Sequence, residues 1–94
     1  MNALASIDLL ESTHDFPCAY VLKAIGRAED GFVGRVVAAV RDQLEADIDP
    51  PYRVKATRAG RHVSVTMEPV MQSAWDVIAV YGRIQDIAGL VFLL

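Results

Sequence analysis

The stretch YRVKATRAGRHVSVTM, residues 52–67, alternates apolar and polar side chains on both sides of a turn at Gly60. This period of two is typical of a β-hairpin in which each strand has one apolar and one polar face. Because only the apolar face needs cover, the pattern predicts an antiparallel sheet that is packed on one side. Pro50 and Pro51 end anything helical before the hairpin, and Pro69 ends the ladder of its second strand.

An amphipathic helix is predicted on each side of the hairpin. Ahead of it, apolar residues recur at intervals of three and four across residues 31–46, and Asp30 is the predicted N-cap. After it, Ser73 and Asp76 fit a capping pattern in which the serine oxygen accepts a backbone N–H, for a helix whose left-handed cap is Gly89. The two apolar stripes are Val33, Val36, Val37, Val40 and Leu44, and Ala74, Val77, Ile78, Tyr81 and Ile84.

A strand at each outer end completes the pattern, at residues 20–25 after Pro17 and at residues 90–94. The order strand, helix, strand, strand, helix, strand is a ferredoxin-like βαββαβ two-layer sandwich of the α+β class. Right-handed crossovers then give an antiparallel sheet of order 4-1-3-2 with both helices on one face. We expect the helices to cover the apolar side chains of the hairpin, namely Val54, Ala56, Val63, Val65 and Met67.

Length and composition describe one small domain, since the chain has 94 residues, of which 53% are apolar and 22% charged. Residues 1–15 lack a sustained period, so we expect a flexible or loosely docked arm ahead of a domain at residues 16–94. The net charge of −3 argues against a protein that coats nucleic acid. The first residues lack the features of a signal peptide or membrane anchor, and a cytoplasmic location is expected.

Several short motifs occur in order along residues 16–94. They are Phe16-Pro17-Cys18, Leu22-Lys23-Ala24-Ile25-Gly26, Val63-Ser64-Val65-Thr66, Val80-Tyr81 and Val91-Phe92-Leu93-Leu94. Together they resemble the YbeD-like family of small bacterial proteins of undetermined function. The resemblance implies an ACT-like ferredoxin fold, similar in architecture to small regulatory domains of amino-acid metabolism. The family has no established catalytic residues to carry over to this chain.

The segment before the first predicted helix is a candidate ligand site. Glycines and arginines ahead of a helix N-terminus can bind an anion through backbone N–H groups. The predicted residues of an ACT-like site for a small polar ligand are Gly26, Arg27, Asp30, Gly31 and Phe32. The alternatives are a structural turn and the phosphate loop of an acylphosphatase-like hydrolase. That enzyme also needs an asparagine on the hairpin, where this sequence has none.

The polar face of the sheet is a second candidate, as an interaction surface for a protein partner or a second copy. Its predicted residues are Lys23, Arg53, Lys55, Ser64 and Thr66. An ordinary solvated face is the alternative. Nucleic acid is disfavoured because RNA-recognition domains of this topology carry aromatic rings on the central strands, and the matching positions here carry none.

No residue pattern indicates catalysis, a metal site or a cofactor. Cys18, His14 and His62 are the candidates for a nucleophile or a soft-metal ligand, and no CxxC pair accompanies the cysteine. We therefore expect a non-enzymatic regulatory or adaptor domain that acts through a small polar ligand or a protein partner. An acylphosphatase-like hydrolase and an RNA-binding module are the alternatives.

The last strand, residues 90–94, is entirely apolar and lies at an edge of the predicted sheet. Because side chains alternate along a strand, part of this apolar surface must face away from the helices, beside Val21 and Ile25. Monomers seldom leave such a patch uncovered. Either the arm, led by Leu9 and Leu10, folds over it, or a second copy pairs with it; we favour a homodimer through the Leu90 to Leu94 edge.

Overall fold

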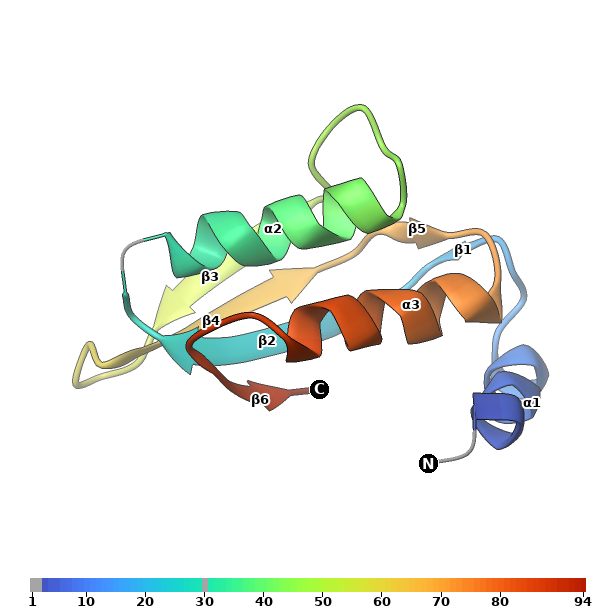
Figure 1. Ribbon diagram of the computed structural model, residues 1–94, viewed down its shortest axis with the longest axis horizontal. Helices are drawn as coiled ribbons and strands as arrows, with labels where there is room; N and C mark the ends of the chain where they lie inside the picture. The colour runs from blue at the N-terminus through green and yellow to red at the C-terminus, as the bar shows by residue number, and fades with distance from the viewer. Residues whose placement is uncertain (1–2, 30) are drawn as a thin grey trace.

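The computed structural model describes residues 3–29 and 31–94 and shows, for these, an α+β protein with three helices and two antiparallel sheets (Figure 1). The predicted hairpin consists of β3 (Tyr52–Ala56) and β4 (His62–Met67). Its turn contains Gly60 at φ 72°, a left-handed conformation that glycine adopts without steric cost.

Four strands make the larger sheet, in the order β3-β4-β2-β6. Its centre is β2 (Leu22–Arg27), which pairs with β4 on one side and with β6 (Leu90–Leu93) on the other. Counted along the predicted strands, this is the order 4-1-3-2 of the sequence analysis. A second, two-stranded sheet of β1 (Cys18–Ala19) and β5 (Val70–Met71) was not predicted. The strand predicted at residues 20–25 therefore begins two residues later than expected.

Helices α2 (Phe32–Gln43) and α3 (Ala74–Gln85) lie side by side on one face of the four-stranded sheet (Figure 1). The predicted stripe of α2 is confirmed where Val36, Val37 and Val40 are buried. In α3 the buried stripe includes Val80, which was not predicted. The largest fully buried side chains are Phe32, Leu22, Met67, Met71, Ile84, Val36, Val40, Val65, Val77 and Val80.

The N-terminal segment is more regular than the sequence analysis expected, because α1 (Ala3–Thr13) is a helix. It packs against α3, on the side of the sheet that carries the helices, and Ile7 is only 5% exposed (Figure 1). A helix this short is stable mainly through such tertiary packing, which local periodicity does not report. The boundary predicted near residue 15 stays a prediction.

Strand β3 is less covered than expected. Val54 and Ala56 pair with Val65 and Val63 and therefore lie on the helical side of the sheet, yet Val54 is 47% exposed. The reason is that α2 contacts the central strands β4 and β2, so the edge strand lies beyond the helical layer. The prediction that the helices cover Val54 and Ala56 is wrong.

The helix ends also differ from the predicted ends. Gly31, at φ 84°, is the N-cap of α2, and Asp30, the predicted cap, lies outside the described residues. α3 ends at Gln85, so Gly89, at φ 92°, belongs to the turn before β6 and is not the helix cap. Glycine is suited to both positions because their φ angles are positive.

Ser73 is the N-cap of α3, as predicted, but its side chain makes no capping hydrogen bond. The carboxylate of Asp76 closes this end of the helix, because its Oδ2 accepts a hydrogen bond of 2.8 Å from the backbone N–H of Gln72. Both residues of the predicted capping pattern therefore lie at the helix start, but the side-chain hydrogen bond is made by the Asp76 carboxylate and not by the Ser73 oxygen.

We expect Asp76→Ala to lower the free energy of unfolding by about 1 kcal/mol, since it removes a charge-assisted hydrogen bond at the helix start. Ser73→Ala should change it by less than about 0.5 kcal/mol, because no side-chain bond is lost. Urea denaturation of both variants checks the assignment. A larger loss from Ser73→Ala than from Asp76→Ala would contradict it.

The tightest packing in the fold joins Phe32 of α2 to Gly26 of β2. Phe32 is fully buried, and a Cβ atom added to Gly26 would lie 2.2 Å from its ring Cζ. No side chain can occupy position 26 unless the ring moves. Gly26 is therefore required by packing at the point where α2 begins.

We expect Gly26→Ala to lower the free energy of unfolding by about 1–3 kcal/mol, as overpacked cores do. Gly34→Ala is the matched control, because a Cβ at Gly34 meets nothing within 4 Å. Gly34 lies in the first turn of α2, where this control should raise stability by at most about 0.5–1 kcal/mol. Urea denaturation measures both; a neutral Gly26→Ala would contradict the close approach.

Candidate functional site

The structure does not gather the predicted loop residues into a binding pocket. Gly26 and Phe32 are buried against each other, whereas Arg27 and Gly31 are exposed. Asp30 lies outside the described residues. Two of the predicted site residues, Gly26 and Phe32, are therefore part of the core packing.

Backbone N–H groups of this loop are already engaged within the protein. The N–H of Arg27 donates to the Gly89 carbonyl at 2.9 Å, and that of Ala28 to the Arg61 carbonyl at 2.9 Å. The N–H of Phe32, at the start of α2, donates to the Glu29 carbonyl at 3.2 Å. An anion cradle needs such groups free, so these contacts favour a structural turn.

The predicted interaction residues, in contrast, lie together on the sheet face opposite α2 and α3. Two rows run across β3, β4 and β2, namely Arg53-Thr66-Lys23 and Lys55-Ser64-Ile25. Thr66, between Arg53 and Lys23, is only 8% exposed, while Arg53 and Lys55 are exposed. We call the side chains of Lys23, Arg53 and Lys55 the basic half of the open face.

One acidic side chain borders the basic half. Glu68 Oε1 lies 3.6 Å from Arg53 Nη1, and the Arg53 side chain is 74% exposed. An exposed pair of this kind contributes little and leaves the guanidinium available. The depression beside Arg53, between β3 and β4, is small, with a volume of about 130 Å³.

The part of the open face along β6 is apolar. Phe92 pairs with Ile25, and Leu94 exchanges two backbone hydrogen bonds with Lys23, so Phe92 and Leu94 face away from the helices. Phe92 and Leu94 are 55% and 57% exposed, and Val21 of the same face is 58% exposed. The expected apolar patch beside Val21 and Ile25 is confirmed.

The candidate nucleophile and metal ligands do not converge. Cys18 precedes the Leu22 end of β2, whereas His62 pairs with Arg27 at its other end. His14 contacts the rings of Phe16 and Tyr20. Within residues 3–29 and 31–94 no group of three or more His, Cys, Asp or Glu side chains could hold a metal ion.

Over the same ranges, no helix is long and apolar enough to cross a bilayer.

A groove that the sequence analysis missed runs between α1, α3 and the end of β6, with a volume of about 650 Å³. Its walls are mostly apolar and include Leu9, Ile78 and Leu93. Tyr81 also lines the groove, and its hydroxyl donates a 3.0 Å hydrogen bond to the Leu94 carbonyl. One wall is α1, whose helix was not predicted, so the sequence offered no signal for the groove.

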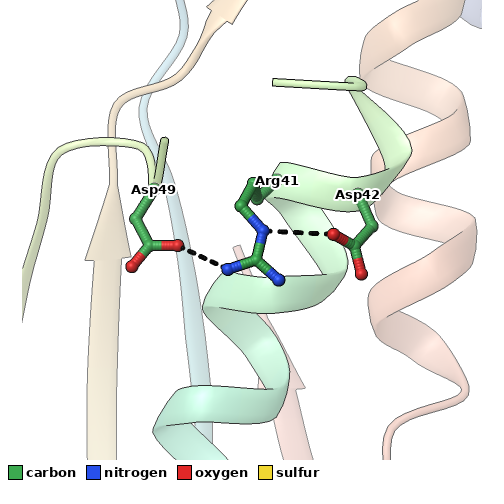
Figure 2. Close-up of polar contacts among 3 residues, drawn as sticks. All are labelled: Arg41, Asp42 and Asp49. Carbon is green, nitrogen blue, oxygen red and sulfur yellow. Dashed lines mark hydrogen bonds and ion pairs between the residues drawn. The ribbon is translucent and has the colours of Figure 1, made fainter. Parts of the chain in front are cut away.

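Arg41 lines a second depression, which has a volume of about 310 Å³ and lies beside the loop that follows α2. Figure 2 shows its guanidinium between two carboxylates, with Nε 3.1 Å from Asp42 Oδ1 and Nη1 3.0 Å from Asp49 Oδ1. Asp42, followed by Asp49, raises the pKa of Arg41. These contacts tie the loop to the helix end and leave no charged group of the cluster without a partner.

Comparison with known proteins finds relatives without an assigned activity. The family described as "Protein of unknown function (DUF493)" matches residues 11–94. The UPF0250 protein of Shewanella oneidensis is 33% identical over 75 residues, which cover 80% of this chain and 83% of the relative. The UPF0250 protein of Shewanella amazonensis is 29% identical over 85 residues, with coverages of 86% and 94%.

One solved structure is similar in fold. The solution structure of protein HP0495 from H. pylori matches with a TM-score of 0.56 at 15% sequence identity. The match covers 86% of this chain and 85% of that protein. At this identity the likeness concerns the fold alone.

The Tyr81 hydroxyl in the groove should make the stability of the protein depend on pH. Burial, followed by the neighbouring Tyr20 hydroxyl, raises the pKa of Tyr81 above its ordinary value. The folded chain therefore holds the Tyr81 hydroxyl proton more tightly than the unfolded chain, in which tyrosine has a pKa of about 10. Stability contributed by the protonated phenol is present below that pH and is lost as the pH rises above it.

We expect the free energy of unfolding to fall as the pH rises past about 10. The fall should be less steep for Tyr81→Phe, and the difference in slope should correspond to at most one proton. Urea denaturation of both proteins between about pH 8 and about pH 11 measures the difference in slope. Parallel curves would show that the folded state does not protect this phenol.

Proposed function

The chain belongs to the DUF493 family of proteins of unknown function, which includes the YbeD-like proteins that its motifs resemble, and we propose that it is a non-enzymatic adaptor or regulatory domain. We assign it an ACT-like variant of the ferredoxin-like fold, to which α1 and the β1–β5 ladder are added. The observation that carries the proposal is the basic half of the open face, where Lys23, Arg53 and Lys55 lie on the side of the sheet opposite α2 and α3.

The shape of this face favours a protein partner over a small ligand. Sites for small molecules are concave and have volumes of about 300–1,000 Å³. The depression beside Arg53 has only about 130 Å³. A depression this small instead suits a partner that covers the face with an extended surface.

The charge of the face indicates an acidic segment as the partner's contribution. The whole chain carries a net charge of −3, whereas three basic side chains lie on this face, one of them, Arg53, beside the Glu68 carboxylate. An incoming carboxylate can replace the weak contact of Arg53 with Glu68. Complementary charge of this kind speeds association and is sensitive to salt.

The alternative functions have less support. An acylphosphatase-like hydrolase would need free N–H groups in the loop before α2, but those of Arg27, Ala28 and Phe32 donate to carbonyls of the protein. An RNA-binding sheet would need aromatic rings on its central strands, and the open-face positions of β2 and β4 hold none. A cytoplasmic location belongs to the same proposal.

We expect the double variant Arg53→Glu/Lys55→Glu to lose its partner. The full chain, tagged and crosslinked in a lysate of the native organism, should recover one acidic protein with the unchanged sequence and at least about tenfold less with this variant, since opposed charges cost several kcal/mol across an interface. Arg58→Glu/Arg61→Glu is the matched control, because it makes the same charge change at the exposed hairpin turn.

Equal recovery with both double variants, or recovery that does not respond to salt, would contradict an acidic partner on the basic half. The same protein incubated with acetyl phosphate tests the hydrolase alternative. Turnover above that of the buffer would replace the adaptor proposal, whereas no turnover leaves the crosslinking result to decide.

A further inference from the structure

The two edges of the four-stranded sheet differ in a way that points to self-association. We propose that two copies of this chain pair through β6, antiparallel to each other about a two-fold axis at Phe92, and so join their sheets into one. The proposal goes beyond the adaptor function, because it uses β6 and not the basic half of the open face.

Charge separates β6 from the other edge strand. β3 carries Arg53 and Lys55 and follows Pro50 and Pro51, and charged residues and prolines are the usual protection of an edge. The four residues of β6 are all apolar and carry no charge. Pairing of β6 with its own copy therefore opposes no like charges, whereas pairing of β3 with its own copy brings basic side chains together.

The backbone of β6 has a free side. Leu94 N–H donates to the Lys23 carbonyl at 2.8 Å, and the Leu94 carbonyl accepts from Lys23 N–H at 3.2 Å. Consecutive residues of an antiparallel strand direct these groups to opposite sides, so the N–H and C=O of Leu93 point away from β2. Among the described residues, no strand pairs with β6 on that side.

The apolar part of the open face defines the register. With the axis at Phe92, the two Phe92 side chains lie directly opposite on the open face. Leu93 of each copy then lies opposite Val91, which the irregularity in the β2–β6 pairing leaves without a partner on β2. Val91 and Phe92 are 54% and 55% exposed in the single chain. Their apolar surface then continues across the axis, next to Leu94 of each copy.

A second copy is favoured over a foreign strand because the same edge and the same apolar surface are present on both sides of the axis. A two-fold contact pairs the two β6 edges and covers the apolar surface of both copies at the same time. The N-terminal helix does not compete for this face, since α1 packs against α3. Arg53 and Lys55 of each copy lie on β3, at the opposite edge of the sheet from β6, and stay outside the contact.

Sedimentation velocity on the full chain, from about 1 µM to about 1 mM, measures the association. We expect the mass to rise from 10.3 kDa towards twice that value. Phe92→Lys should weaken the dimer by at least about tenfold, because it removes an aromatic pair and opposes two like charges. Val54→Lys, on the other edge strand and similarly exposed at 47%, should leave it unchanged.

Mixing Phe92→Lys with Phe92→Glu tests the register, since opposite charges across the axis should restore a dimer that neither variant forms alone. Hydrogen exchange of the unchanged chain gives a readout without any variant: the Leu93 amide should exchange more slowly as the concentration rises. A monomer at about 1 mM, a dimer that Val54→Lys breaks and Phe92→Lys does not, or Leu93 exchange that is independent of concentration would each overturn the proposal. A mixture that stays monomeric would overturn the register.

Discussion

Phe32 is the side chain on which the arrangement of the other elements depends, because its ring lies directly on Gly26 of β2 and next to Gly89 of the turn before β6. It is fully buried and opens α2, so a single ring joins one helix, the central strand and the turn that leads into the last strand. Only glycine at position 26 permits this approach. The same contact turns the loop before α2 into a part of the core.

The layer structure leaves one face of the sheet without helices, and the distribution of side chains divides that face. α2 and α3 cover the central strands, so the buried side is apolar, and β3 extends beyond it. On the open side, Arg53 and Lys55 belong to β3 at one edge. Phe92 of β6 and Leu94, which directly follows β6, lie at the other edge. A basic and an apolar surface can therefore serve two different contacts on one sheet.

The periodic segments could be predicted from the sequence because their pattern reflects burial directly. The hairpin of residues 52–67 and the stripe of Val36, Val37 and Val40 have the expected structures. The basic half of the open face followed from the same alternation, since strand phase determines the face of each side chain. The sequence left both a structural turn and a ligand site open for the loop before α2, because glycine and arginine occur alike in anion sites and in packed turns; the hydrogen bonds of its N–H groups favour the turn.

The sequence by itself determined the order of the main elements, the central sheet and the polar or apolar character of each face, since these depend on local periodicity and on residues that start or stop an element. Tertiary structure alone decided that β3 extends beyond the helical layer, how α1 packs on α3, and which atom caps α3. It also decided that Phe32 fills the space above Gly26. These features depend on contacts between residues far apart in the chain, whose free energy has no counterpart in the pattern of neighbouring residues.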